Sequence, residues 1–282
     1  MAKTAFVTDS TAYIPASQVK QFDITVIPQV LIWDEQTLLD GIDIQPTAFY
    51  ERMRESKTMP TTSQATIGAF KEAFEPLVEA GRSILAILIS NKLSGTIQSA
   101  EQAKAEFPEA TIVIIDSEAA AMAMGFQVLA AARAAREGKS FEEVTEIARQ
   151  AKLQTGVVLL VDTLEYLHRG GRIGGASRFL GTVLNLKPIL ELQDGVIEAV
   201  DRVRTRSKAQ ARLLDILEER IDGRPNLRLA VLHAAAEQQA RELLEVAANR
   251  LNPMETVFSE VSPVVGAHVG PGTIGLCYSV ES

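Results

Sequence analysis

The chain has 282 residues, of which 46% are hydrophobic and 23% are charged, and its formal net charge is −8. This length predicts about two domains, and the composition is typical of a globular protein and excludes a largely disordered chain. An acidic chain without a broad basic face is not expected to bind nucleic acid or to insert stably into a membrane.

The first part of the chain alternates between strand-like and helix-like segments. Residues 1–4 lead directly into an apolar run at 5–7, so no signal peptide is expected. Residues 83–90 form a continuous apolar run, which is typical of a strand buried on both faces. A helix predicted over about 95–107 separates it from another buried strand at 111–115, and this spacing predicts a parallel crossover. Other predicted elements are a strand at 24–27 and helices at 118–136 and 141–152.

The pattern changes after about residue 155. Asp194-Gly195 is a hairpin signal between predicted strands at 187–192 and 196–200. The last predicted strand, 273–280, contains the single cysteine, Cys277, which excludes an intrachain disulfide and which we expect to be a small buried core residue. The remaining predicted elements are strands at 156–161 and 227–232 and helices at 207–220 and 236–251.

These segments predict an α/β protein of two domains. The N-terminal domain, 1–155, is expected to hold a mostly parallel sheet flanked by helices. The C-terminal domain, 156–282, is expected to be α+β with a mixed or antiparallel sheet. No run of about 18 apolar residues is present, so no membrane-spanning helix is expected and we predict a soluble, cytoplasmic protein.

Hydroxyl-bearing residues follow several of the predicted strands. In open α/β sheets, ligands bind beyond the carboxyl ends of the strands, so these segments are candidates for a site. They are Thr8-Asp9-Ser10-Thr11, the segment 91–96 with Ser94-Gly95-Thr96, and Asp116-Ser117. Another such segment, 60–64 with Thr62 and Ser63, precedes a predicted helix. Ser94 and Thr62 or Ser63 can be ordinary helix N-caps, but the free N–H groups of a helix start also suit a carboxylate or phosphate.

Two glycine-rich segments contain further candidates. Gly270, Gly272 and Gly275 match G-x-G-x-x-G, but the residues after them form a predicted strand and not a helix, so we reject a dinucleotide site. No G-x-x-x-x-G-K-[ST] motif is present, which predicts that the chain has no ATP cradle of its own. His268 lies in this same segment, expected to be a loop, where glycines allow close approach of a ligand.

Arginines mark the other glycine-rich segment and a second cluster. Arg169-Gly170-Gly171-Arg172 can be a flexible turn, or its arginines can bind a phosphate or carboxylate. Arg202, Arg204, Arg206 and Lys208 alternate by two, which indicates one face of a strand running into a helix. This face is either solvated or a docking patch for a partner.

Taken together, the chain resembles the DegV family over essentially its whole length. The resemblance depends on six segments in one order: Thr8 to Thr11, Thr61 to Gln64, Leu93 to Thr96, Asp116-Ser117, Arg169 to Ile173, and Gly266 to Gly275 with His268. It implies two α/β domains with a long-chain fatty acid, such as a C16 or C18 acid, held between or beneath them. It also implies that similar proteins present this acid to a separate ATP-dependent fatty acid kinase, which makes an acyl phosphate for phospholipid synthesis.

The resemblance also assigns residues. Thr62 and Ser94 would hold the carboxylate, with His268 close to the head group and Ser63, Gly95 and Thr96 beside them. Arg172 or Arg169 would be the basic residue near the site, and Arg204 lies in the possible partner patch. Neither a metal nor a further cofactor nor any intrinsic catalysis is expected for such a carrier.

Enzymatic alternatives remain open from the residues alone. Ser94 could be the nucleophile of an acyl hydrolase, although it does not lie in G-x-S-x-G. His268 could instead be the phosphoacceptor of a phosphotransfer protein. A nucleophile needs a base within hydrogen-bond reach, which a sequence does not reveal.

Overall fold

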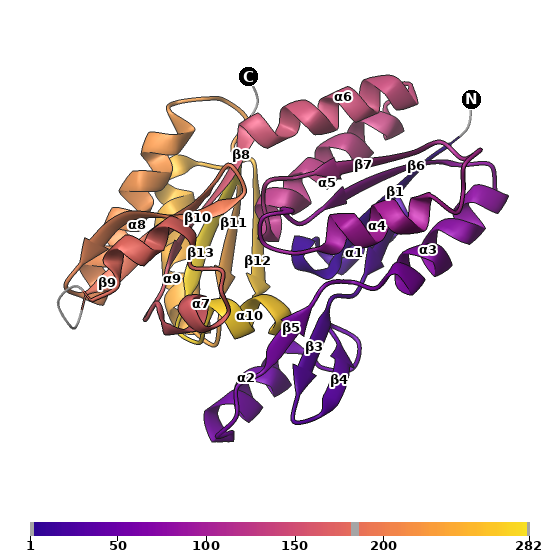
Figure 1. The fold of residues 1–282 in the computed structure, drawn as a ribbon. Helices are drawn as coiled ribbons and strands as arrows, with labels where there is room; N and C mark the ends of the chain where they lie inside the picture. Colours follow the sequence, from indigo (N-terminus) through magenta and orange to yellow (C-terminus); the bar gives the residue numbers. More distant parts are fainter. Residues whose placement is uncertain (1–2, 182–185, 281–282) are drawn as a thin grey trace.

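The computed structural model describes residues 3–181 and 186–280, and these form two lobes, each built on a sheet. Figure 1 shows the sheet of the first lobe on the right and that of the second on the left, with helices packed around both. A small third sheet projects below the junction of the lobes. The predicted fold class, a parallel sheet flanked by helices followed by a mixed sheet, is confirmed. The division into domains at residue 155 stays a prediction.

The first sheet has the strand order β2-β1-β6-β7 and is wholly parallel. Side chains alternate along β1 and β6, so that Ala5, Val7 and Ala86 face α3 and α4, while Phe6, Leu85 and Ile87 face α5 and α6. Both faces are therefore buried, as the continuous apolar runs predict. The strands are β1 (Thr4–Asp9), β2 (Ile24–Ile27), β6 (Ser83–Leu88) and β7 (Ile112–Asp116), and the helices are α1 (Ala16–Phe22), α3 (Ile67–Glu79), α4 (Thr96–Lys104), α5 (Ala121–Arg136) and α6 (Phe141–Ala151).

The second sheet has the order β10-β9-β8-β13-β11-β12 and is mixed. Only the pair β11 and β12, which α9 connects, is parallel. The predicted hairpin at Asp194-Gly195 is confirmed as the antiparallel pair β9 and β10. The elements are β8 (Thr155–Leu160), β9 (Lys187–Gln193), β10 (Val196–Val203), β11 (Arg228–His233), β12 (Glu255–Glu260), β13 (Ile274–Ser279), α7 (Glu165–Arg169), α8 (Arg206–Ile221), α9 (Glu237–Leu251) and the short 3-10 helices η2 (Lys152–Gln154) and η3 (Gly174–Phe179). A further 3-10 helix, η1 (Ser10–Ala12), follows β1 in the first lobe.

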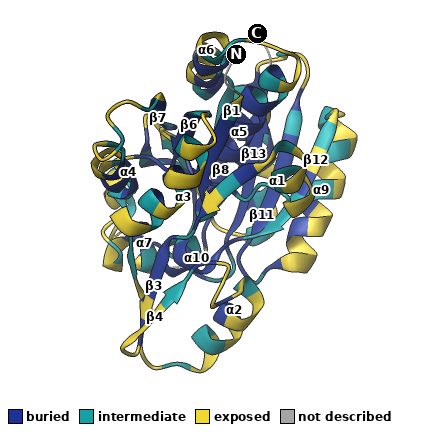
Figure 2. Ribbon diagram, turned by 90° about the vertical axis from the view of Figure 1, so that its right-hand side faces the viewer, coloured by how far each residue is buried: buried dark blue, intermediate teal, exposed yellow. Residues whose placement is uncertain are grey.

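Helix α5 joins the two lobes through a shared core. Twelve of its sixteen residues are buried, and it packs against both β1 of the first sheet and β8 and β13 of the second. Its many alanines allow two sheets to approach the same helix closely. Cys277 of β13 is fully buried in this shared core, as predicted. Figure 2 shows β8 and β13 as buried strands, whereas α2 and α9 carry exposed outer faces.

The small third sheet, β4-β3-β5, was not predicted. Its strands are only three or four residues long: β3 (Val30–Trp33), β4 (Gln36–Leu39) and β5 (Thr61–Ser63), with α2 (Pro46–Glu55) between the last two. The hairpin turn at Asp34-Glu35 has positive φ at both residues, 49° and 67°, without a glycine to announce it. Thr62 and Ser63 therefore lie in a strand, and their prediction as a helix start was wrong. The N-cap of α3 is Thr66, whose side chain accepts from the N–H of Ala69.

Two further predictions need correction. His268 does not lie in a loop but in α10 (Pro263–Val269). Proline at the first helical position favours this start, and Gly266 is required because a Cβ there would overlap Tyr50 and Phe49 of α2. Ser94 is not the N-cap of α4, since that position is Gly95, which makes no side-chain capping bond.

Candidate functional site

A cavity lies where the two lobes and the small sheet meet, in the region of α10 and β5 in Figure 1. The cavity volume is about 120 Å³. Most of its wall is aliphatic, with side chains such as Ile89, Leu159, Leu192 and Val264. Polar side chains also line it, and they are Thr11, Tyr13, Gln29, Thr62, Ser63, Gln64, Ser94, Arg172, His268 and Thr273. A mostly apolar cavity with a few placed polar groups is typical of a small-molecule site.

Thr62 and His268 form a hydrogen-bonded pair across the junction. Oγ1 of Thr62, in β5, lies 2.7 Å from Nε2 of His268, in α10. The other ring nitrogen, Nδ1, is buried and has no hydrogen-bond partner among the described residues. An unpaired acceptor is tolerated better than an unpaired N–H, so the proton belongs on Nε2. Nε2–H then donates to Thr62, and the hydroxyl hydrogen of Thr62 is available to a ligand.

His268 is held as a neutral imidazole. Burial, with a smaller contribution from the charge of Arg172, lowers the pKa of His268 to about 4. Its ring packs directly on Gly170, where a Cβ would overlap Nδ1 and lie 2.8 Å from Cε1. Of the two glycines in the segment 169–172, Gly170 is therefore the one that close packing on His268 requires.

Ser94 belongs to a second chain of hydrogen bonds. Its Oγ lies 2.8 Å from Oγ1 of Thr96, and Oγ1 of Thr96 lies 2.9 Å from Nε2 of Gln29. Oε1 of Gln29 accepts from the N–H of Ala65 at 3.0 Å. Ser94 lines the cavity, whereas Thr96 is fully buried behind it. Thr96 thus supports Ser94 from behind.

Arg172 links two loops beside the cavity through hydrogen bonds. Its Nε donates to the carbonyl of Leu93 at 3.0 Å, and its Nη1 donates to the carbonyl of Gly170 at 2.7 Å. One guanidinium therefore links the loop before Ser94 to the turn that packs on His268. It also lines the cavity, where its remaining donors can face an anion.

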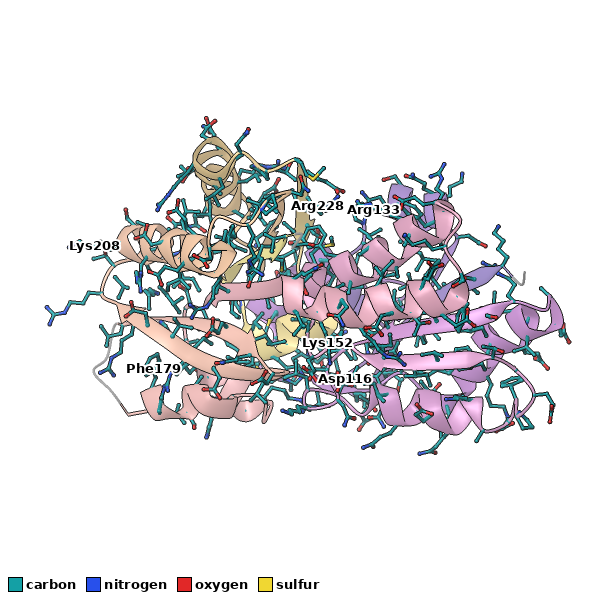
Figure 3. All side chains as sticks on the ribbon, turned by 90° about the horizontal axis from the view of Figure 1, so that it is seen from above. Asp116, Arg133, Lys152, Phe179, Lys208 and Arg228 are labelled. Atoms are coloured by element: carbon teal, nitrogen blue, oxygen red, sulfur yellow. The ribbon has the colours of Figure 1, made fainter. Side chains whose placement is uncertain are left out.

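The other predicted arginines lie apart from the cavity. Arg169 is exposed and forms an ion pair with Glu165 one turn earlier in α7, at 2.6 Å. Arg204 is exposed between β10 and α8. Of the same cluster, Arg206 is engaged with Asp162 and with the carbonyl of Gly272, so the alternating cluster does not act as one free patch. Arg202 is exposed and stacks over Phe179, and Figure 3 shows Phe179 and Lys208 at the outer end of this lobe.

The remaining predicted residues, Ser63 and Gly95, lie at or beside the cavity wall. Ser63 lines the cavity, and its Oγ lies 3.5 Å from Oε1 of Gln64. Gly95 allows the amide of Gln64 to approach, since a Cβ there would lie 3.3 Å from Cδ of that side chain. Gln29 was missed, and Gln64 was named only as part of the segment 60–64, without a role. Gln29 follows the predicted strand 24–27, so the rule that identified the other strand ends could have identified it.

Ser94 and His268 form hydrogen bonds to different residues and not to each other. Ser94 is paired with Thr96, and the accessible nitrogen of His268 is paired with Thr62. A hydrolase would need serine and imidazole within hydrogen-bond reach of each other. Over residues 3–181 and 186–280, no three His, Cys, Asp or Glu side chains gather as a metal site would require.

No helix in the described parts of the chain has the length and apolar character needed to cross a bilayer.

Comparisons with known proteins agree with one another. Residues 3–281 match a family model described as an uncharacterised protein of the DegV family. A DegV family protein from Thermus thermophilus, whose structure is described by its fatty acid binding, is 36% identical over 99% of this chain and 100% of that chain, with a TM-score of 0.93. DegV of Bacillus subtilis, described as a fatty acid binding protein, is 33% identical over the full length of both chains, with a TM-score of 0.90. A stearic acid-binding protein from Eubacterium ventriosum is 25% identical over 99% of this chain and 98% of that chain, with a TM-score of 0.90.

Proposed function

The chain belongs to the DegV family, and we propose that it binds a long-chain fatty acid and presents the carboxylate to a separate ATP-dependent kinase, without catalysis of its own. One observation carries the proposal: a mostly apolar cavity is lined by the hydroxyls of Thr62 and Ser94 and by the neutral His268, which is paired with Thr62. The acyl chain would lie along the aliphatic wall and the carboxylate against these donors.

The chemistry of the polar end suits an anion. The hydroxyls of Thr62 and Ser94 can each donate to one carboxylate oxygen, and hydrogen bonds to a charged acceptor contribute about 1.5–3 kcal/mol each. Arg172 adds a positive charge close by. Burial of a sixteen-carbon chain contributes on the order of 12 kcal/mol before the costs of ordering and association, at about 0.8 kcal/mol per methylene. Affinity would thus come from the chain and orientation from the head group.

The related proteins support this ligand class. Those from Thermus thermophilus and Bacillus subtilis are described as binding fatty acid, and that from Eubacterium ventriosum as binding stearic acid, which has eighteen carbons. A C16 or C18 acid is therefore the proposed ligand of this chain.

Transfer to a kinase is the proposed use of the bound acid. A carboxylate oxygen would attack the γ-phosphorus of ATP, ADP would leave, and an acyl phosphate would result. The sequence contains no G-x-x-x-x-G-K-[ST] motif, so the nucleotide would be held by the partner. Arg202 and Arg204 are exposed cations in an acidic chain, and they suit the docking of such a partner.

Native mass measurement tests the proposal. Protein purified without denaturation should carry one fatty acid, which organic extraction releases and identifies. The double variant Thr62→Ala with Ser94→Ala should retain at least about tenfold less lipid, because two hydrogen bonds to the carboxylate are lost. Ser17→Ala with Thr256→Ala, two exposed hydroxyls outside the cavity, is the matched control and should retain lipid fully. A folded site variant with full lipid content would refute the assigned head-group site.

A further inference from the structure

Gly275 lacks a side chain at a point where the structure has room for one. It lies in the interior of β13, and its φ is not in the left-handed region that favours glycine. A Cβ at this position would lie 3.6 Å from the carbonyl oxygen of Val158 and 3.8 and 3.9 Å from Cβ of Leu159 and Leu232, which are ordinary contact distances. Because glycine in a strand interior is less stable than alanine, neither the backbone nor the packing of the protein explains its presence.

The other glycines of the segment 266–275 differ from Gly275 in this respect. At each of them a Cβ would overlap a side chain that is already present, and these are Gly266 against Tyr50, Gly270 against Tyr166 and Gly272 against Asp162. The packing of the protein itself therefore requires those three glycines, whereas it does not require Gly275. Gly275 is also the last glycine of the G-x-G-x-x-G match, which lacks the following helix of a dinucleotide site.

The space beside Gly275 faces the cavity and is apolar. Leu159 in β8 and Leu232 in β11 are the cross-strand partners of Gly275, so the three residues share one face of the second sheet, and all three line the cavity. Of the three atoms nearest to the missing Cβ, only the carbonyl oxygen of Val158 is polar, and a buried water needs two to four polar partners. A hydrocarbon group therefore suits this space better than a water molecule.

We propose that Gly275 is a specificity-determining residue, whose missing side chain opens the path by which the acyl chain crosses β13 between Leu159 and Leu232. The inference rests on the proposed function, because it concerns the hydrocarbon part of the same ligand. A methylene group can approach the sheet more closely over a bare Cα than over any side chain, and the two leucines then contact it from both sides. Gly275 thus sets the space that an acyl chain has at this point of the cavity.

Gly275 lies away from the head-group residues along β13. Oγ1 of Thr273 donates to the carbonyl of Val269 at 2.9 Å, and Val269 directly follows His268 in α10. Gly275 is two residues beyond Thr273, about 7 Å further along the strand. Methylene groups of the chain, and not the carboxylate, would therefore pass over Gly275. A substitution there should change the binding of the chain and leave the head-group contacts in place.

Isothermal titration of lipid-free Gly275→Ala with hexadecanoic acid, together with urea unfolding, tests the inference. The added methyl group should weaken binding by at least about fivefold, since it overpacks a space that the chain fills. Without ligand, the same variant should unfold at an equal or higher urea concentration than the wild type, because alanine is better than glycine in a strand interior. Gly275→Val should weaken binding further. Gly68→Ala is the matched control with wild-type affinity, because Gly68 is exposed in α3, lies outside the cavity and also has room for a Cβ.

The two measurements separate a blocked path from a damaged fold. Weaker binding with undiminished stability in Gly275→Ala, and wild-type affinity in Gly68→Ala, supports the inference. Unchanged affinity in Gly275→Ala, or an equal loss in Gly68→Ala, overturns it and leaves fatty acid binding intact. A lowered unfolding midpoint also overturns it, because the ligand-free protein would then itself require the glycine. If Gly275→Val fails to fold, Gly275→Ala alone decides. A wild type that binds no hexadecanoic acid overturns the proposed function itself.

Discussion

Substitution of Gly170 by alanine is a direct steric probe of His268. The backbone of Gly170 has φ of −75°, which alanine adopts without strain, so the effect of the new Cβ is purely one of packing. That Cβ would overlap Nδ1 of His268 and lie 2.8 Å from Cε1, where ordinary contact begins at about 3.4 Å. The ring therefore has to retreat by at least about 0.6 Å, and further to clear Nδ1. The 2.7 Å bond to Thr62 cannot survive such a shift unchanged.

The expected losses of affinity and stability in Gly170→Ala follow from the lost hydrogen bond and from the overpacking. Loss of one hydrogen bond that orients the Thr62 donor should weaken fatty acid binding by about three- to tenfold. Overpacking should lower the free energy of unfolding by about 1–3 kcal/mol. Isothermal titration with hexadecanoic acid and urea unfolding measure the two effects. Gly68→Ala in α3 is the control, because its nearest neighbour would be Oγ1 of Thr66 at 3.8 Å. Wild-type affinity in folded Gly170→Ala would refute the placement of His268 at the head group.

Three other outcomes are expected. The pKa of His268 is about 4 in the folded protein, below its usual 6.5. Its contribution to the free energy of unfolding is therefore present above pH 6.5 and is lost as pH falls toward 4. His268→Asn should remove this contribution, at most about 3 kcal/mol, in urea unfolding measured from pH 4 to 7. Burial raises the pKa of Asp40 to about 6. Its contribution to the free energy of unfolding is therefore present below about pH 4 and is lost as pH rises through 6. Asp40→Asn should remove this pH dependence from the urea unfolding curves, and an unaltered dependence of the free energy of unfolding on pH would contradict the assignment. Burial also raises the pKa of Cys277 to about 12, so a thiol reagent at pH 8 should label it only after urea unfolding, and rapid labelling of native protein would disprove its burial.

The main elements could be predicted from sequence because their apolar patterns are strong. The continuous run at 83–90 contains β6, and the Asp194-Gly195 turn marks the β9–β10 hairpin. The small sheet was not predicted because its strands are too short to show an alternating apolar pattern. Its Asp34-Glu35 turn also adopts positive φ without glycine. Helix α10 was not predicted because Gly266 suggested a loop, whereas this glycine is needed for packing against α2.

The candidate site residues could be selected from sequence, but their hydrogen-bond partners could not. Strand ends and the family resemblance identify Thr62, Ser94 and His268, yet the bond between Thr62 and His268 joins residues 206 positions apart. Its existence depends on how α10 packs beside the small sheet, which no local pattern encodes. The hydrogen bond from Gln29 to Thr96 likewise depends on the orientation of one amide, which the neighbouring N–H of Ala65 determines.

Neutral donors at the proposed head-group site would matter for a protein that has to release its ligand. A salt bridge between a buried cation and the carboxylate would have to be broken before the acid could react, and breaking a buried pair leaves an uncompensated charge. Here the cation of Arg172 donates to the carbonyls of Leu93 and Gly170, so part of its donor capacity is already used within the protein. Hydroxyls with single hydrogens can turn back toward their own partners when the ligand leaves. At the proposed site, a carboxylate would therefore be oriented by hydroxyls that pair again with their own partners when it leaves.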